Sequence, residues 1–377
     1  MSLKTEIFNT VSDIPQNYWD DLDCCGNIYY SPPFLKAYED GNPDIKFNYI
    51  CITRDGEAIA FANTQLVNIS IKTITKNIKM NAWLKRNINR FFCNNSINVL
   101  FCGNIFLSGE YGTFLKDGEE KVEAFKNLAE GIKRLTRKLK GLTGIFVKDF
   151  KNESLHITKH LDEFGYTPMQ VEPNMIIHLK PELKTFEDYK LALKSKYRVK
   201  ANKADSKSES LVAKRMTSKD IDTHKSQLQE LYQNTIDNAD FNAQVLNLDT
   251  YSFLKKHYKN EFTVIGYFLE DKLVSFLSAM KNGENLDAHF IGIDYSLNKT
   301  YGIYPRILND YVRLGLETEA KQINLGRTAS EIKSTLGAVP ESLTCYFKHK
   351  KSLPNRLISP FVHNVKIKSF KQHQPFK

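Results

Sequence analysis

Hydrophobic residues in the first half of the chain follow two periods, which predict strands and helices in alternation. The stretch "FNYICITRDGEAIAFANTQLVNI" (47–69) is two β-rich runs joined by an Asp-Gly turn, the pattern of a hairpin. A glycine-broken strand pattern follows at 97–115. Apolar residues at helical spacing then predict a long amphipathic helix over 121–142, and "GIFVKDF" (144–150) predicts another strand.

The second half repeats this order of elements. A charged helix pattern starts near residue 185 and runs into a polar, Ser/Lys-rich link that ends near residue 210. The later predictions are helices at 220–239 and 248–258, three strands within 262–295, a helix at 303–319 and a strand at 322–326. Residue identities between the halves are too few for a sequence repeat, so the duplication is one of pattern. We expect an α/β protein with mixed (α+β) sheets and domains at 1–180 and 181–350, followed by a basic tail at 351–377.

The stretch "INLGRTASEIKSTLGAVPESLTCYF" (323–347) predicts a compact strand–helix–strand. Thr328 can cap the helix, with Glu331 three residues later as its capping-box partner. Gly337 is placed to end the helix in the left-handed conformation. A Gly-Arg-Thr set therefore lies at a strand-to-helix corner, where backbone N–H groups and a guanidinium can face one anion.

Length and composition narrow the class of protein. A chain of 377 residues with 41% hydrophobic residues is large enough for two buried cores. It contains no secretory h-region and no run of about 20 apolar residues. We therefore expect a cytoplasmic protein. The cysteines have no metal-ligand spacing to histidines, so we expect reduced thiols and no metal site. They are Cys24, Cys25, Cys51, Cys93, Cys102 and Cys345.

The net charge of +10 belongs to two segments. The chain has no acid from Ala58 to Gly109, where it has six basic residues, and none after Glu341, where it has eight. Within the first segment, at 71–92, Trp83 and other apolar residues fall on one helical stripe that Lys85, Arg86 and Arg90 flank. A cationic, acid-free helix of this kind is typical of a membrane interface. A core helix with a solvated face is the alternative.

Three stretches of the second half resemble the GNAT superfamily of acyltransferases, in the branch of the Fem-type aminoacyl transferases and FemAB-like proteins. "LKSKYRVKANKA" (193–204) is similar to the basic helix that leads into the second domain of that branch. Residues 286–317 resemble the central GNAT strand, the loop that faces a pyrophosphate and the helix after it. Residues 325–347 resemble the closing Gly-Arg-Ser/Thr, lysine, glycine and strand pattern. The resemblance implies two GNAT-like domains in tandem, with the active site in the second.

The resemblance places the catalytic candidates on the central strand and the helix that follows. Strict alternation puts Asp287, His289, Ile291 and Ile293 on one face of the strand, and Leu286, Ala288, Phe290 and Gly292 on the other. His289 is our candidate base, and Asp287 is expected to orient it and raise its basicity. A structural histidine at the sheet surface is the alternative, and Tyr304 is a further catalytic candidate.

The candidate binding residues lie in two short segments. Lys299, Tyr301 and Gly302 precede a helix whose N-terminus could bind the pyrophosphate of acyl-CoA, the expected co-substrate. Coenzyme A enzymes of the superfamily usually have closely spaced glycines here, whereas this chain has one. Arg327, Thr328 and Lys333 form a second set that can bind a carboxylate or phosphate of the substrate.

These expectations lead to one function and two alternatives. We expect an N-acyltransferase that moves an acyl group from acyl-CoA or a related carrier to an amine, with a lipid or cell-envelope precursor as one class of acceptor. An anionic membrane surface is the expected partner, at the inner face of the membrane; tRNA is a weaker candidate, and no DNA-binding pattern is present. The alternatives are a Fem-type aminoacyl transferase that uses aminoacyl-tRNA, and a non-catalytic tandem-GNAT module that binds a membrane or a partner.

Overall fold

The computed structural model describes residues 3–70, 96–238, 244–365 and 367–377. The basic segment at 71–92, with Trp83, Lys85, Arg86 and Arg90, therefore lies outside the described residues, and its membrane role stays a prediction. The chain divides into two compact units. Unit 1 comprises residues 1–171, 240–246 and 342–367, and unit 2 comprises 172–239, 247–341 and 368–377. The C-terminal end thus differs from the predicted domains, because residues 342–367 pack with unit 1 and the last ten with unit 2.

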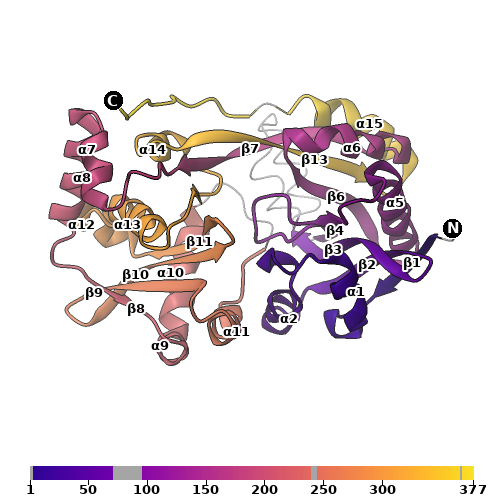
Figure 1. Ribbon diagram of the computed structural model, residues 1–377, viewed down its shortest axis with the longest axis horizontal. Coiled ribbons are helices and arrows are strands. Elements are labelled where there is room, and N and C mark those ends of the chain that lie inside the picture. Colours follow the sequence, from indigo (N-terminus) through magenta and orange to yellow (C-terminus); the bar gives the residue numbers. More distant parts are fainter. Residues whose placement is uncertain (1–2, 71–95, 239–243, 366) are drawn as a thin grey trace. The chain divides into compact units, whose positions relative to one another are not determined.

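Unit 1 contains a mixed sheet whose strands follow the order β1-β2-β3-β4-β6-β13, with β5 paired to β3. The hairpin β2–β3 is antiparallel and β4 runs parallel to β6, with the helix α5 between them in sequence. The strands (Figure 1) are β1 (Leu3–Phe8), β2 (Lys46–Arg54), β3 (Glu57–Ser70), β4 (Ser96–Cys102), β5 (Thr113–Leu115), β6 (Leu142–Phe150) and β13 (Val339–His349). The helices are α1 (Gln16–Leu22), α2 (Pro32–Gly41), α5 (Lys121–Lys138), α6 (Leu155–Thr158) and α15 (Ser352–His363). Short 3-10 helices span Val11–Asp13, Ile28–Tyr30, Asn152–Ser154 and Lys159–Phe164.

Helix α5 covers the sheet of unit 1 with the face that its sequence period predicts. Phe125, Leu128, Ile132 and Leu135 recur at helical spacing and are buried against Ile50 and its neighbours on the strands. Glu120 caps the helix by accepting hydrogen bonds from its first N–H groups. Burial of this apolar stripe holds α5 against β1, β2 and β3.

Unit 2 repeats the arrangement with strands in the order β7-β12-β11-β10-β9-β8. β9, β10 and β11 form an antiparallel meander, and β11 pairs in parallel with β12 after the helix α13. The strands are β7 (Thr167–His178), β8 (Val212–Arg215), β9 (Phe262–Leu269), β10 (Lys272–Asn282), β11 (Asn285–Ile293) and β12 (Gln322–Asn324). The helices are α7 (Phe186–Ala192), α8 (Ser195–Lys207), α9 (Ser218–Thr223), α10 (Lys225–Asn238), α11 (Asp249–His257), α12 (Tyr295–Tyr301), α13 (Ile303–Glu317) and α14 (Ser330–Ser334).

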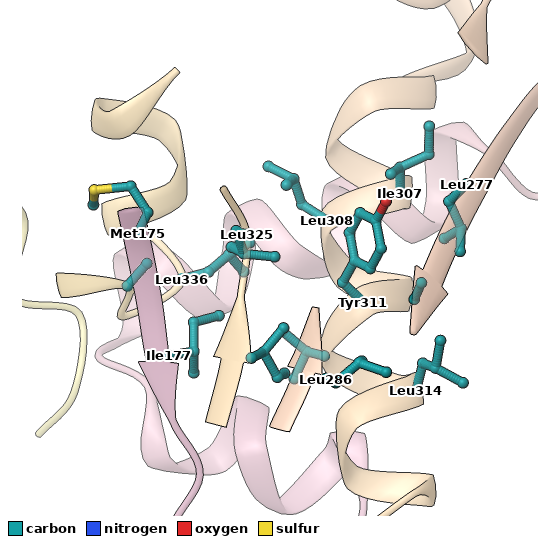
Figure 2. Packing of buried hydrophobic residues seen from close by; sticks show 14 of the residues in the cluster. Met175, Ile177, Leu277, Leu286, Ile307, Leu308, Tyr311, Leu314, Leu325 and Leu336 are labelled. Atoms are coloured by element: carbon teal, nitrogen blue, oxygen red, sulfur yellow. The ribbon is translucent and has the colours of Figure 1, made fainter. Parts of the chain in front are cut away.

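The core of unit 2 lies between α13 and the sheet. Ile307, Leu308, Tyr311 and Leu314 of α13 face apolar residues of the strands, among them Leu286 (Figure 2). The predicted polar link is instead the second half of α8. Its Asp205 pairs with Arg313 of α13 at 2.6 Å, so the polar residues fix a helix–helix contact.

Helix α10 packs closely on the sheet at Gly292 of β11. A Cβ atom there would lie 2.2 Å from the ring of Phe276 and 2.8 Å from the backbone of Leu231 on α10. Gly292→Ala is therefore expected to lower the free energy of unfolding by about 1–3 kcal/mol or more, because the backbone of α10 must move. Thermal unfolding measures the loss. Gly26→Ala is the matched control, since nothing lies within 4 Å of its Cβ position, and equal melting temperatures of the two variants would contradict the prediction.

No helix in the described ranges combines the length and the hydropathy needed to cross a bilayer.

Candidate active site

The parallel strands β11 and β12 pair over only three residues and then separate. Asp287 and Asn324 are the last paired residues, while β11 continues to Ile293. From Ala288 to Ile293 the described strand neighbour of β11 is β10 alone. We call this parting of the strands the fork. An edge of β11 that lacks a strand partner presents backbone groups to whatever occupies the opening.

A side-chain hydrogen bond joins the two strands where the fork begins. Asn324 Nδ2 donates to Asp287 Oδ1 at 3.0 Å, and Asn324 Oδ1 accepts from the backbone N–H of Gly326 at 2.9 Å. Asp287 is buried, so the amide satisfies part of its hydrogen-bonding capacity. Asn324 thus links the fork to the turn that follows β12. Our sequence reasoning missed this residue, although an Asn two residues before a Gly is a typical turn signal.

A β-bulge lies on β11 just beyond the fork. Ala288 to Ile291 spans three steps of β11, whereas the paired residues Ala279 to Leu277 span two steps of β10. The extra residue lies at His289–Phe290, and Ser278 holds it. Ser278 Oγ accepts from Phe290 N at 3.0 Å and donates to Phe290 O at 2.8 Å.

The bulge corrects our assignment of the faces of β11. Leu286, Ala288, Ile291 and Ile293 all pack into the core beneath α13. Phe290 instead contacts the ring of Tyr232 on α10, with ring centroids 5.0 Å apart. Strict alternation fails here because an extra residue shifts every later side chain to the opposite face.

His289 lies on the bulged segment, with its ring 6.0 Å from that of Phe262. Burial lowers its pKa to about 4, so the imidazole is neutral at pH 7. We expected Asp287 to raise the pKa of His289. The pKa is instead lowered, because burial removes solvent from the imidazole and penalises its charged form. A neutral imidazole can still accept a proton in a reaction.

The N-terminus of α13 differs from the predicted pyrophosphate site. Lys299 and Tyr301 belong to the short helix α12, and Gly302 joins it to α13 with a positive φ of 59°. Tyr304 N donates to the side chain of Asn298 at 2.9 Å, and the next residue is Pro305, which has no N–H. Two of the N–H positions that a helix start offers to phosphate are thus used or missing. Burial raises the pKa of the Tyr304 hydroxyl well above its usual value, so this group stays protonated.

The backbone of the turn after β12 is strained, and a buried lysine side chain holds it. Gly326, Thr328 and Ala329 all have positive φ, which non-glycine residues rarely adopt. α14 starts at Ser330, and its N-cap is Ala329, which makes no side-chain capping bond. The predicted cap at Thr328 is therefore wrong. Thr328 has a left-handed conformation and belongs to the turn before the helix. Outliers of this kind cluster at binding sites.

Lys333 fixes this turn. Its Nζ donates to the carbonyl oxygens of Arg327 at 2.6 Å and Gly326 at 3.2 Å. Gly337 has the predicted left-handed φ of 94°, and its N–H donates to Ser334 O at 3.0 Å. It does not itself end the helix, because α14 ends at Ser334 with Thr335 as its C-cap. The structure therefore brings Arg327, Thr328 and Lys333 together at the end of β12, beside the Asn324 that forms the fork.

Burial lowers the pKa of Lys333 to about 7. Between this value and its ordinary 10.5 the unfolded chain binds more protons than the folded chain. The free energy of unfolding should therefore rise with pH between these two values, by at most about 1.4 kcal/mol per pH unit. Lys333→Met is expected to remove this rise. Urea unfolding of both proteins at pH 7 to 10 measures it. Parallel curves of unfolding free energy against pH would contradict the lowered pKa of Lys333.

Taken together, β11, its bulge, the fork and the α13 crossover define a GNAT-like fold, which the chain contains twice in tandem. Three solved structures share this fold along nearly their whole length. FemX has 11% identity and a TM-score of 0.56, covering 94% of this chain and 100% of that one. A tandem GNAT protein from the clavulanic acid biosynthesis pathway has 10% identity and a TM-score of 0.54, covering 92% and 98%. L-PGS from Bacillus licheniformis has 11% identity and a TM-score of 0.50, covering 89% and 98%. The sequence matches no family model, and a search of curated proteins found no match.

Proposed function

We propose that the protein is an N-acyltransferase that transfers an acyl group to an amine at the fork of unit 2. The observation that carries the proposal is the separation of β11 from β12 beyond Asp287 and Asn324. An acyl carbonyl in this opening can accept a hydrogen bond from a backbone N–H of β11, which stabilises the oxyanion of the tetrahedral intermediate. The amine attacks that carbonyl carbon, loses a proton, and the carrier leaves with the electron pair of the broken bond.

The residues around the fork suit this reaction in different ways. His289 is neutral and lies on the bulged segment just beyond the fork, so it can accept the proton of the attacking amine. Arg327, on the strained turn, can bind an anionic group of a substrate in two-pronged fashion. Lys333 holds that turn by two carbonyl oxygens and positions Arg327.

The N-terminus of α13 bears on the choice of acyl carrier. An acyl-CoA donor needs a site for its pyrophosphate, and the hydrogen bond from Tyr304 N to Asn298 occupies part of the expected one. This contact favours a carrier whose phosphates bind elsewhere, and aminoacyl-tRNA is the candidate that the resemblance implies. Exposed Lys196, Lys200 and Lys203 on α8 offer a cationic surface for RNA phosphates.

Two parallel assays test the proposal. Thiol release is measured with a panel of acyl-CoA species, and transfer of a labelled aminoacyl group is measured with charged total tRNA, each with a panel of amines. We expect transfer from charged tRNA that Arg327→Ala impairs. Thiol release without transfer from tRNA would identify acyl-CoA as the carrier in place of aminoacyl-tRNA, and the protein would still be an N-acyltransferase. Silence in both assays would contradict the proposal and favour the non-catalytic binding module.

A further inference from the structure

The side of helix α15 of unit 1 that faces the protein is mixed, because Pro354, Ile358 and Val362 are half-buried there beside the polar residues Asn355 and Ser359. Asn355 Nδ2 donates to Gly165 O at 2.9 Å, and Asn355 Oδ1 accepts from His349 N at 2.7 Å. One turn further along, the hydroxyl of Ser359 bonds that of Thr167. Polar contacts therefore fix the rotation of α15 about its axis.

The opposite side of α15 exposes large apolar residues. Leu353, Leu357 and Phe361 recur every fourth residue and are 71%, 64% and 78% exposed. None of the residues of α15 is buried. A helix on the surface of a soluble domain normally turns such a stripe inward. We call Leu353, Leu357 and Phe361 the outer ridge.

A basic cavity of about 560 Å³ lies beside the ridge. Lys348, Lys350 and Arg356 line it together with hydroxyl groups of Ser352 and Ser359. Burial lowers the pKa of Lys348, and the positive charges of Lys133 and Lys350 lower it further. The neighbouring acid Glu130 is engaged in an ion pair with Lys133 at 2.8 Å. The chain has no Asp or Glu after Glu341, so α15 itself brings no acid to this surface.

We propose that the outer ridge and the basic cavity form a docking surface for a bilayer of anionic phospholipid. The ridge enters the interface between headgroups and acyl chains, and the cations beside it meet lipid phosphates. Charge selects this occupant over a second copy of the chain, because self-association would bring two cationic surfaces together, and the nearby acid Glu130 is already paired with Lys133. The ridge favours a bilayer over RNA, because two of its three residues are leucines, which base stacking does not cover, whereas acyl chains cover all three.

Vesicle flotation with the full-length protein tests this surface. One set of vesicles is pure phosphatidylcholine, and the other contains phosphatidylglycerol in equal amount. We expect binding to the anionic vesicles that falls at least tenfold in Leu357→Asp/Phe361→Asp. Arg356→Gln should lower it about fivefold, the value of one charge at an anionic surface. Both changes are at exposed positions, and melting temperatures check that the variants fold.

Leu191→Asp is the matched control, because Leu191 is 60% exposed and belongs to α7 of unit 2. It should bind vesicles like the wild type. Undiminished binding of Leu357→Asp/Phe361→Asp would overturn the proposal by placing the contact elsewhere in the chain. Equal binding to both kinds of vesicle would overturn the role of the cations. A dimer in sedimentation that Leu357→Asp dissociates would assign the ridge to self-association instead.

Discussion

Replacing His289 with Gln is expected to lower kcat about 10²- to 10⁴-fold, the usual contribution of a positioned general base. The expected effect on KM is small, because the imidazole acts on the proton of the attacking amine. Gln keeps the size and a hydrogen-bonding amide but cannot take up the proton. Steady-state rates with the substrates identified by the two transfer assays measure the change. His257→Gln, an exposed position on α11, is the matched control.

A second measurement separates a base from a structural histidine. The pKa of His289 is about 4 in the folded protein and near 6.5 in the unfolded chain. The unfolded chain therefore binds more protons between these values, and wild-type stability should fall as pH decreases through this window. His289→Gln should lose this pH dependence in either case. An unchanged kcat beside the altered pH dependence would identify His289 as structural.

Arg327→Ala is expected to lower kcat/KM about 10- to 100-fold, mainly through KM, because a charge-assisted hydrogen bond to an anionic substrate contributes about 1.5–3 kcal/mol. The melting temperature should change little, since the turn is held by Lys333 through backbone oxygens. Arg327→Lys should recover only part of the loss, because an ammonium lacks the planar two-pronged geometry.

Arg215→Ala provides the control for Arg327. Arg215 is also an arginine of unit 2 and is 55% exposed in an ion pair with Glu317. Its loss should leave kcat/KM unchanged. If Arg327→Ala behaves like Arg215→Ala, the strained turn has no part in substrate binding.

Much of the fold follows from local pattern. The hairpin β2–β3 forms at the Asp-Gly turn, and α5 buries the stripe that its period indicates. The parallel pairing of β11 with β12 follows the predicted strand–helix–strand order. The polar stretch after residue 195 was harder to interpret, because its helix depends on contacts of Asp205 with α13 that lie far away in sequence.

The site was less accessible to sequence reasoning. The bulge at His289–Phe290 depends on Ser278 of the neighbouring strand, and nothing within 285–293 signals it. The conformation of Thr328 depends on the donor Lys333, which reaches back from the next helix. A single buried polar side chain overrides local preference at each of these positions. Candidate residues could be named, but their faces and protonation could not.

The central claim is that the fork receives the acyl group. A crystal structure with a non-transferable analogue of the donor tests it most directly. Our account places the acyl oxygen about 2.7–3.1 Å from a backbone N–H of β11 between Ala288 and Ile293, with Arg327 on an anionic group of a substrate. An analogue bound in the cavity of about 220 Å³ that Tyr30 and Glu110 line in unit 1, with β11 untouched, would contradict it.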